Sequence, residues 1–196
     1  MSAFLVVAAH PAETAHLPPD TDVVLTGIGM SRAATCVTRA IMQRCPTPEE
    51  RSKLTLVNLG SCGGLAPTAH GIFEPSTVIN RDIDGDSMRA LGTDPQDSIP
   101  LADLGQPGDG SVLATGDSFI ADDAVRDALA QRADLVDMEG FAVAVACREL
   151  GVRLRMVKHI SDHADEQALA WADQVDQSAR ALARWWVDFQ AEQSRA

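Results

Sequence analysis

Tyrosine is absent from the 196-residue sequence, and aromatic residues make up only 4% of it. No apolar run approaches the roughly 20 residues that a membrane-spanning helix needs. The first residues, MSAFLVVAAHPAE, lack the basic lead and the long apolar stretch of a secretion signal. These absences predict a cytoplasmic protein without a membrane anchor.

Positive charge is also scarce. The chain has 16 lysine and arginine residues against 28 aspartate and glutamate residues, which gives a formal net charge of -12. Nucleic acids and anionic membrane surfaces are themselves negatively charged, so such an acidic chain is a poor partner for either. We therefore expect no nucleic acid and no membrane among its partners.

Recognisable metal and cofactor motifs are missing as well. The cysteines Cys36, Cys45, Cys62 and Cys147 form no CxxC pair and no other zinc-like spacing. The short GIG at 27–29 is not a GxGxxG dinucleotide motif, and no Walker-type lysine is present. Cys62 and Cys147 have apolar neighbours and are expected to be small buried thiols. The sequence predicts neither a metal nor an organic cofactor.

What is present is an alternation of apolar runs and helical patterns. Runs typical of strands buried on both faces lie at 3–9, 22–26, 54–60, 76–80, 111–115 and 153–160. Helical patterns lie at 32–44, 121–132 and 138–150, and in a long amphipathic stretch from Ala168 onward. Alternating strands and helices predict one α/β layered domain over residues 1–196 with a mostly parallel central sheet.

Local signals refine this prediction. Ser31 is placed to cap the helix that follows it, and Gly151 is placed to end the helix 138–150. Residues 46–53 are interpreted as a connection, and 82–110, rich in Asp, Gly and Pro, as an excursion over the surface.

The stretch LVNLGSCGGLAP, residues 56–67, holds three glycines, a serine and a cysteine in five consecutive positions. So little side-chain volume after a buried strand predicts that something comes close to the backbone. Other polar clusters follow predicted strands at His10–Glu13, Asp117–Ile120 and Ser161–Asp162, and Asp137–Glu139 opens the buried helix. Because ligands gather at the carboxyl ends of strands in α/β sheets, these clusters predict a binding site.

Taken singly, each cluster has a simpler explanation. Glu13 could be a solvated loop acid, Glu139 a helix-start acid, Asp162 a helix cap and GSCGG a tight turn. Glu139 also stands beside the apolar GFAVAVAC, a setting that raises the pKa of a carboxyl group. The combination carries more information than any one member.

Four segments in order, GSCGGLAP, TGDSFI, VDMEGFAVA and ISDHADEQ, resemble the purine nucleoside phosphorylase and nucleosidase superfamily. The chain is most similar to its 5'-methylthioadenosine/S-adenosylhomocysteine nucleosidases. The resemblance runs from about Phe4 into the terminal helix. It implies a three-layer α-β-α sandwich with a mostly parallel mixed sheet, a purine nucleoside as ligand, a role in methionine salvage and a homodimer.

The resemblance implies a role for each motif residue. Asp162 matches the acid that protonates N7 of the departing purine, and Glu139 matches the carboxylate that holds the ribose hydroxyls. Glu13 matches the general base that activates water. Other substrate-binding residues implied by the motifs are Ser61, Gly63, Phe119, Ile120, Asp137, Met138, Lys158 and Ser161.

Two features favour water over phosphate as the attacking group. Related phosphorylases carry an arginine two residues before the glycine stretch, where this chain has Asn58. Glu13 would repel phosphate and activate water. Lys158 stands where the nucleosidases usually carry an arginine, and keeps a positive charge near the nucleophile without a bidentate grip.

The expected reaction is hydrolysis of the N-glycosidic bond of 5'-substituted adenosines, such as 5'-methylthioadenosine or S-adenosylhomocysteine, with release of adenine. The 5' group is less defined, because His10 replaces a methionine and the polar segment 81–110 contains no aromatic residue. The alternatives are a futalosine or aminodeoxyfutalosine hydrolase, hydrolysis of a nucleotide, a phosphate-dependent phosphorylase, and a non-catalytic nucleoside-binding homologue.

Overall fold

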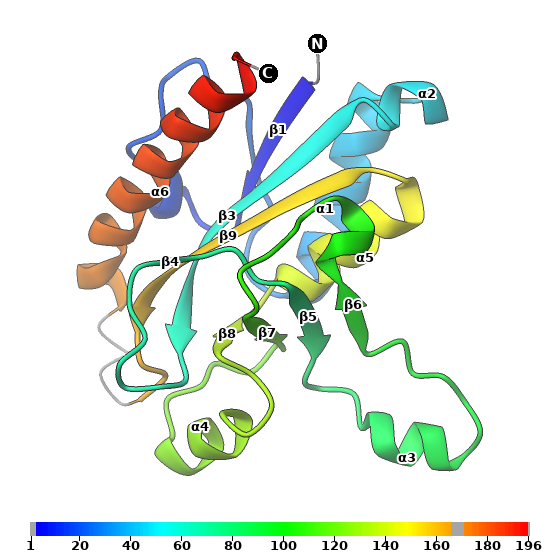
Figure 1. Ribbon diagram of the computed structural model, residues 1–196, viewed down its shortest axis with the longest axis vertical. Coiled ribbons are helices and arrows are strands. Elements are labelled where there is room, and N and C mark those ends of the chain that lie inside the picture. Colours follow the sequence, from blue (N-terminus) through cyan, green and yellow to red (C-terminus); the bar gives the residue numbers. More distant parts are fainter. Residues whose placement is uncertain (1–2, 166–170, 196) are drawn as a thin grey trace.

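The computed structural model describes residues 3–165 and 171–195 (Figure 1). Within these residues, nine strands form one sheet: β1 (Ala3–Ala8), β2 (Val23–Leu25), β3 (Leu54–Gly64), β4 (Ile72–Phe73), β5 (Thr77–Asn80), β6 (Ser98–Pro100), β7 (Val112–Thr115), β8 (Leu135–Asp137) and β9 (Arg153–Asp162). The helices are α1 (Met30–Arg44), α2 (Pro48–Arg51), α3 (Gly85–Ala90), α4 (Asp123–Leu129), α5 (Gly140–Leu150) and α6 (Trp171–Gln193), with short 3-10 turns η1 (Pro11–Thr14) and η2 (Leu101–Leu104).

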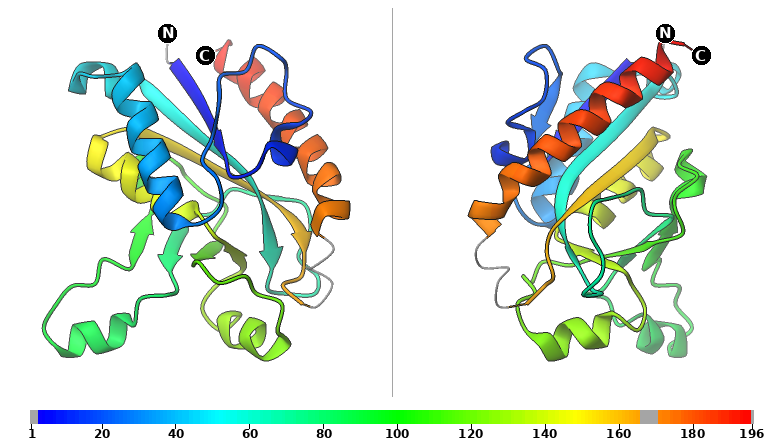
Figure 2. Two further views of the ribbon diagram at one scale, coloured as in Figure 1. Left: turned by 180° about the vertical axis from the view of Figure 1, so that it is seen from behind. Right: turned by 60° about the vertical axis from the view of Figure 1, so that its left-hand side comes forward.

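The sheet is mixed but mostly parallel, as predicted. Its main path runs β2-β1-β3-β8-β7-β5-β6, and β9 pairs with β3 and β4 beside this path. The pairs β1–β2, β1–β3, β3–β9, β5–β7 and β7–β8 are parallel. Helix α6 covers one face, and α1 and α5 lie together on the other (Figure 2). The predicted layered α/β fold is therefore confirmed.

Strand β3 explains why this sequence places a strand at the centre of the sheet. Val57 and Leu59 pack against α6, while Leu56, pointing to the opposite face, joins the core beneath α1 and α5. All three are fully buried. A strand covered on both faces needs an unbroken apolar run, which is the pattern that residues 54–60 display.

The terminal helix confirms its predicted periodicity. The side chains that recur at helical spacing are all buried, namely Val175, Ala179, Leu182, Trp186 and Phe189. The ring of Phe189 stacks on that of Trp185, with 4.9 Å between the ring centroids. The expected start at Ala168 lies outside the described residues.

Local sequence signals predicted the end of α5 correctly but not the start of α1. Gly151 ends α5 in the left-handed conformation, with φ 66°, as expected. The prediction that Ser31 caps α1 is wrong, because α1 begins at Met30 with Gly29 as its N-cap and Ser31 lies inside the first turn. Carboxylates from distant segments accept the first backbone N–H groups instead.

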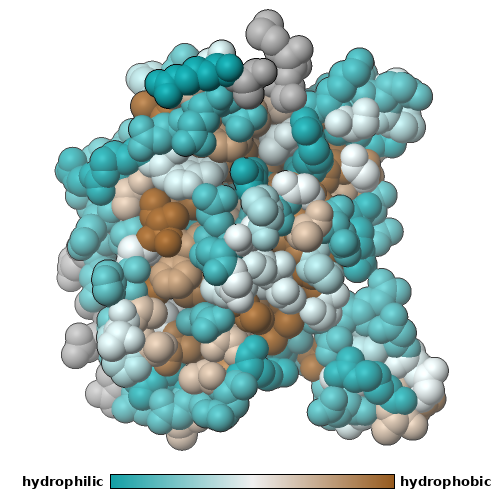
Figure 3. All heavy atoms as spheres, in the orientation of Figure 1, coloured by the Kyte–Doolittle hydropathy of each residue, from teal (hydrophilic) through white to brown (hydrophobic). Residues whose placement is uncertain are grey.

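The interpretation of 46–53 and 82–110 as irregular segments is also incomplete. The first contains α2, whose start Thr47 and Glu50 stabilise with reciprocal hydrogen bonds. The second contains α3, β6 and η2, and its Ile99 and Leu101 are fully or almost fully buried. The exposed part around α3 forms the lobe at the lower right of Figure 3, where hydrophilic surface predominates. None of the described helices is long and apolar enough to span a membrane.

Candidate active site

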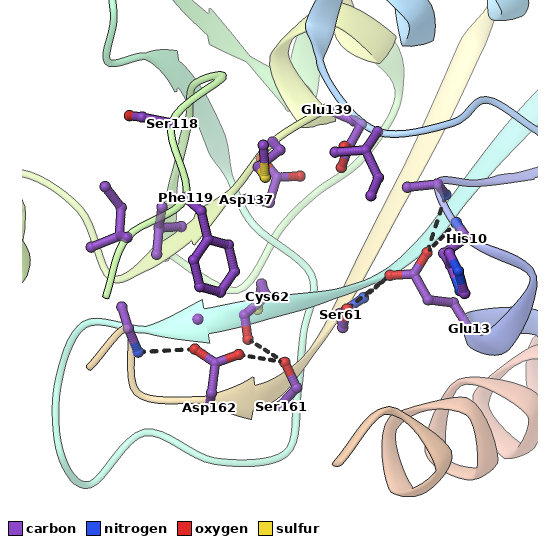
Figure 4. A pocket seen from close by; sticks show the side chains of 17 residues that line it. His10, Glu13, Ser61, Cys62, Ser118, Phe119, Asp137, Glu139, Ser161 and Asp162 are labelled. Carbon is purple, nitrogen blue, oxygen red and sulfur yellow. Dashed lines mark hydrogen bonds between the residues drawn. The ribbon is translucent and has the colours of Figure 1, made fainter. Parts of the chain in front are cut away.

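A cavity of about 310 Å³ opens where β1, β3, β7, β8 and β9 end (Figure 4). Strands in an α/β sheet bring the segments that follow them to a common edge, although those segments are far apart in the sequence. Of the predicted site residues, those that line the cavity are Glu13, Ser61, Gly63, Phe119, Ile120, Asp137, Met138, Glu139, Ser161 and Asp162. Their chemical roles remain predictions, but the structure brings them to one place.

Glu13 is buried in the turn η1, directly after β1, and is only 4% exposed. Its Oε2 accepts backbone hydrogen bonds from Ala9 and His10, at 3.1 and 3.0 Å. Its Oε1 accepts from the backbone N–H and the hydroxyl of Ser61, at 2.7 and 2.8 Å. Four donors therefore fix the carboxylate in one orientation at the cavity wall, so Glu13 is not a solvated loop acid.

The glycine stretch is part of a strand and not a loop or turn. Strand β3 continues through Gly64, with an irregularity in its pairing to β9 between Cys62 and Gly63. A Cβ added to Gly60 would lie 3.0 Å from Lys158 Nζ and 3.5 Å from Glu13 Oε1. The expectation that something approaches this backbone is thus met by the protein's own charged side chains.

Gly63 makes a second close approach. A Cβ there would lie 3.2 Å from Asp162 Oδ1 and 3.0 Å from Val136 Cγ1. Such distances are tighter than ordinary carbon contacts. The missing side chain lets Asp162 sit directly against the strand.

Asp162 ends β9 and is held by its neighbours. Its Oδ1 accepts from the backbone N–H of Ala164 at 2.9 Å, and its Oδ2 accepts from the hydroxyl of Ser161 at 2.7 Å. Figure 4 shows Asp162 on the same side of the cavity as Cys62 and beneath the ring of Phe119. The carboxyl group thus faces the part of the cavity that an aromatic ring borders.

Glu139 precedes α5 and is 9% exposed. Its Oε1 accepts from the backbone N–H of Gly29 at 2.8 Å, across 110 positions of sequence. Burial raises the pKa of Glu139 to about 7, and the nearby carboxylate of Asp137 adds to the increase. The N–H of Gly29 and the ammonium of Lys158 oppose it. The sequence-based expectation of a raised pKa agrees with this environment.

Asp137 lines the cavity, but its oxygens already have partners. Oδ1 accepts from the hydroxyl of Thr115 at 2.6 Å, and Oδ2 accepts from the backbone N–H of Gly140 at 2.9 Å. Lys158 Nζ lies 2.8 Å from the same Oδ2, and both side chains are 2% exposed. This arrangement suits a group that supports α5 and the cavity wall more than one that contacts a ligand.

Lys158 does not line the cavity, which limits the predicted role of this residue. Burial alone would lower its pKa, but the carboxylates of Asp137, Glu139 and Glu13 outweigh burial and raise it. The ammonium is therefore a buried countercharge for three acids. Its positive charge offsets the negative charge of these acids from outside the cavity lining, so it is not placed to bind an anion in the cavity.

Phe119 and Ile120 lie in the segment between β7 and α4. Ile120 is 8% exposed, whereas Phe119 is 50% exposed and its ring points into the cavity (Figure 4). A planar ligand could stack on such a ring. Met138 and the exposed Ile28 add apolar surface to the lining.

Sequence reasoning did not single out several lining residues: Ala9, Ile28, Val136 and Ala164. His10, Cys62 and Ser118 stood within the polar clusters that predicted a binding site, but Cys62 and Ser118 were given no role there, and His10 only as a replacement beside the 5' group. The signal for Ile28 was the GIG at 27–29, which was considered only as a fragment of a dinucleotide motif. Burial raises the pKa of the Cys62 thiol, so this lining cysteine is a neutral group. In the described part of the chain, no cluster of His, Cys, Asp or Glu could hold a metal ion.

Comparisons with known proteins show what the chain is similar to. The sequence model of the Phosphorylase superfamily matches residues 100–188. A 5'-methylthioadenosine/S-adenosylhomocysteine nucleosidase of Shewanella sp. (strain W3-18-1) is 27% identical and covers 75% of this chain and 71% of its own. An aminodeoxyfutalosine nucleosidase of Helicobacter pylori (strain J99) is 34% identical over 77 residues, or 38% of this chain and 34% of its own.

Solved structures share the fold. The Helicobacter pylori 5'-methylthioadenosine/S-adenosyl homocysteine nucleosidase, in complex with a substituted pyrrolidin-3-ol, superposes with a TM-score of 0.78 at 18% identity, covering 97% of this chain and 98% of that one. The futalosine hydrolase of Helicobacter pylori strain 26695 gives a TM-score of 0.77 at 18% identity, with 97% and 98% covered. These structural matches show the fold, and the predicted resemblance to the superfamily is confirmed by the match of its sequence model and by the 27% identical nucleosidase.

Proposed function

We propose that the protein is a purine nucleosidase that hydrolyses the N-glycosidic bond of 5'-substituted adenosines and releases adenine. The observation that carries this proposal is the convergence of Glu13, Glu139 and Asp162, from three distant segments, on one cavity of about 310 Å³. A nucleoside is of the size that such a cavity accepts.

Each acid has a distinct task in this reaction. Breaking the bond leaves positive charge on the sugar and negative charge on the purine. Asp162 protonates N7 of the purine beneath Phe119, so that the base leaves as a neutral molecule. Glu139 accepts hydrogen bonds from the ribose 2'- and 3'-hydroxyls and stabilises the developing cation.

Glu13 takes a proton from the attacking water. Its Oε1 accepts from the backbone N–H and the hydroxyl of Ser61, in strand β3, at 2.7 and 2.8 Å. Water bound beside Ser61 and Glu13 would therefore lie at the sugar end of the cavity. General acid and general base steps each contribute on the order of 10²- to 10⁴-fold to the rate. Together the three acids account for cleavage without a metal or cofactor.

Hydrolysis is favoured over phosphorolysis by the charge of the lining. Among the described residues that line the cavity there are four acids and no lysine or arginine. Asn58, at the position of the phosphate-binding arginine of related phosphorylases, is buried, and its amide donates to the carbonyl of Val7 at 3.3 Å. Phosphate would therefore meet carboxylates without a cationic partner.

A second candidate is the hydrolysis of aminodeoxyfutalosine. His10 lines the cavity next to Glu13, and its imidazole offers a polar contact where a methylthio group would prefer an apolar one. The Helicobacter pylori relatives named above act on substrates of this class by name. The two candidates differ only in the 5' group.

The wider setting belongs to the same proposal. We place the enzyme in the cytoplasm, in methionine salvage, as a homodimer. The apolar side chains of Ile28 and Phe119 at the cavity are 56% and 50% exposed, and a second copy of the chain would shield them from water. Analytical ultracentrifugation tests the dimer directly.

The test of the activity uses purified protein in phosphate-free buffer. Adenine release is measured with 5'-methylthioadenosine, S-adenosylhomocysteine, aminodeoxyfutalosine and the matching inosine derivatives. The proposal predicts release from at least one 5'-substituted adenosine. Release from none of them, with tight binding of adenosines and no turnover, would identify a non-catalytic binding protein instead.

A further inference from the structure

Arg81 directly follows β5 and reaches the segment that precedes Phe119. Its side chain is only 5% exposed, although it carries a full charge. Nη1 donates to the hydroxyl of Ser118 at 2.8 Å, and Nη2 donates to the carbonyl of Gly116 at 3.0 Å and to the carbonyl of Ser118. One guanidinium thus ties down two residues of the same segment.

Asp82 holds the residue between them. Its Oδ2 accepts from the backbone N–H of Asp117 at 2.7 Å, and its Oδ1 lies 3.5 Å from Nη1 of Arg81. A side chain at Gly116 would collide with Asp82 and Arg81. The consecutive pair Arg81 and Asp82 therefore binds all three residues 116–118 by side-chain contacts.

The same segment is linked to the sugar side of the cavity. Asp117 Oδ1 accepts from the backbone N–H of Met30 at 2.7 Å. The preceding N–H, that of Gly29, donates to Glu139 at 2.8 Å. The start of α1 is therefore held on adjacent residues by the segment beside the purine and by the carboxylate assigned to the ribose.

Residues 116–122 form neither helix nor strand, yet they carry Phe119 and Ile120 to the cavity. A segment that had to be ordered during binding would reduce affinity by the entropy of ordering. Contacts that hold it beforehand remove this cost, and the charge-assisted hydrogen bonds from both terminal nitrogens of Arg81 are well suited to do so. Arg81 does not line the cavity itself, so it acts only through this segment.

We infer that Arg81 is a positioning residue that holds residues 116–120 in the shape that binds the purine. The inference rests on the proposed function, because it takes this segment to be the purine site. It goes beyond that function by making purine affinity depend on a side chain outside the cavity. Neither Phe119 nor Ile120 is changed in the variants that test it.

The experiment compares Arg81→Met, Arg81→Lys and Arg89→Met. Arg89 is the matched control. It lines a second, polar cavity beside α3 together with Arg81, pairs with Asp86 and Asp97, and makes no hydrogen bond to residues 116–120 in the described part of the chain. Calorimetry gives the Kd for adenine, which needs no turnover. Kinetics give kcat and KM for a 5'-substituted adenosine and its inosine counterpart.

The expected result is an adenine Kd about 10-fold weaker or more in Arg81→Met, because the segment must then order on binding. KM should rise more than kcat falls, and the preference for adenosine over inosine should shrink. Arg81→Lys keeps the charge but not the fork, so partial recovery is expected. Arg89→Met should match the wild type.

An unchanged adenine Kd and base preference in folded Arg81→Met would overturn the inference, while wild-type hydrolysis left the proposed function intact. If Arg81→Met does not fold, Arg81→Lys decides, since a wild-type Kd in that variant would equally overturn it. A wild-type protein that neither binds adenine nor releases it would instead overturn the proposed function, and the inference with it.

Discussion

The cavity has two ends that are built in different ways. Strands β3 and β9, with 11 and 10 residues, extend into the cavity, and backbone groups hold Glu13 and Asp162 there. Strand β7, with four residues, stops short of it, and β8, with three, reaches it with Val136 and Asp137 at its end. The segment after β7 depends instead on the side chains of Arg81 and Asp82.

This difference suggests that the two ends of the cavity serve different steps, proton transfer at one and binding of the base at the other. The strand-built end fixes the groups that move protons, and small displacements there should reduce kcat. The loop-built end fixes the surface that binds the base, and loss of its supports should mainly raise KM. The predictions below concern Asp162, Glu13 and Gly63 at the strand-built end and then Glu139, which follows β8, from the largest expected effect to the smallest.

Asp162→Asn should have the largest effect. The amide cannot donate a proton to N7 in place of the acid, so kcat should fall by about 10²- to 10⁴-fold. The amide oxygen can still accept from the N–H of Ala164, so the fold and adenine binding should persist. Steady-state kinetics and calorimetry measure the two quantities. Asp103→Asn, at an exposed position of the turn η2, is the control, and a normal kcat in Asp162→Asn would remove this acid from the mechanism.

Glu13→Gln should reduce kcat by about 10²-fold or more, because an amide does not accept the proton of water. The amide oxygen can retain the hydrogen bond from the N–H of Ser61. The NH₂ group must then face the N–H groups of Ala9 and His10, which donate to the carboxylate in the wild type. Glu49→Gln, on the exposed helix α2, controls for loss of one charge. A fully active Glu13→Gln enzyme would show that another group activates the water.

Gly63→Ala should lower kcat by about 10-fold, since an added Cβ 3.2 Å from Asp162 Oδ1 displaces the acid. Gly64→Ala is the matched control on the next residue. Its Cβ would meet Ile160 at 3.0 Å and Ala69 at 3.3 Å, and not Asp162. Both variants should lose about 1–3 kcal/mol of stability through overpacking. Equal kcat values in the two variants would show that the absence of a side chain at Gly63 does not determine the position of Asp162.

The smallest effect concerns pH. Ribose hydroxyls bind best to ionised Glu139, whose pKa in the free protein is about 7. The apparent affinity for nucleoside should therefore rise as pH increases through this value, and kcat/KM should show the same acidic limb. In Glu139→Gln this limb should disappear, and its persistence would assign the titration to another group.

The carboxyl group of Glu139 also makes the stability of the fold depend on pH. Its folded-state pKa of about 7 lies above the ordinary value of 4.5. The protonated form is therefore favoured by folding, so this contribution to stability is fully present below pH 4.5 and is lost as pH rises through about 7. Thermal unfolding across this range should reveal a decline that Glu139→Gln lacks.

The sequence predicted the features that depend on local pattern. The apolar run of β3 and the spacing of Leu182, Trp186 and Phe189 in α6 reflect burial against neighbouring layers. The motifs around Glu13, Glu139 and Asp162 identified residues that the sheet brings to one cavity. Periodicity and motif were sufficient because each is contained within a short segment.

Features that depend on distant partners were missed. Ser31 was expected to cap α1, but Glu139 and Asp117 accept its first N–H groups from 110 and 87 positions away. The glycine stretch was expected to leave the sheet, yet pairing with β9 and β8 keeps it in strand β3. No local pattern in the segment 81–110 indicated that Arg81 supports the segment beside Phe119.

The most direct test of the central claim is the product formed from 5'-methylthioadenosine with and without inorganic phosphate. The account predicts equal rates of adenine release under both conditions, with free 5-methylthioribose as the sugar product. Release that requires phosphate and yields a sugar 1-phosphate would contradict it, because the carboxylate-lined cavity would then be binding the anion that it should repel.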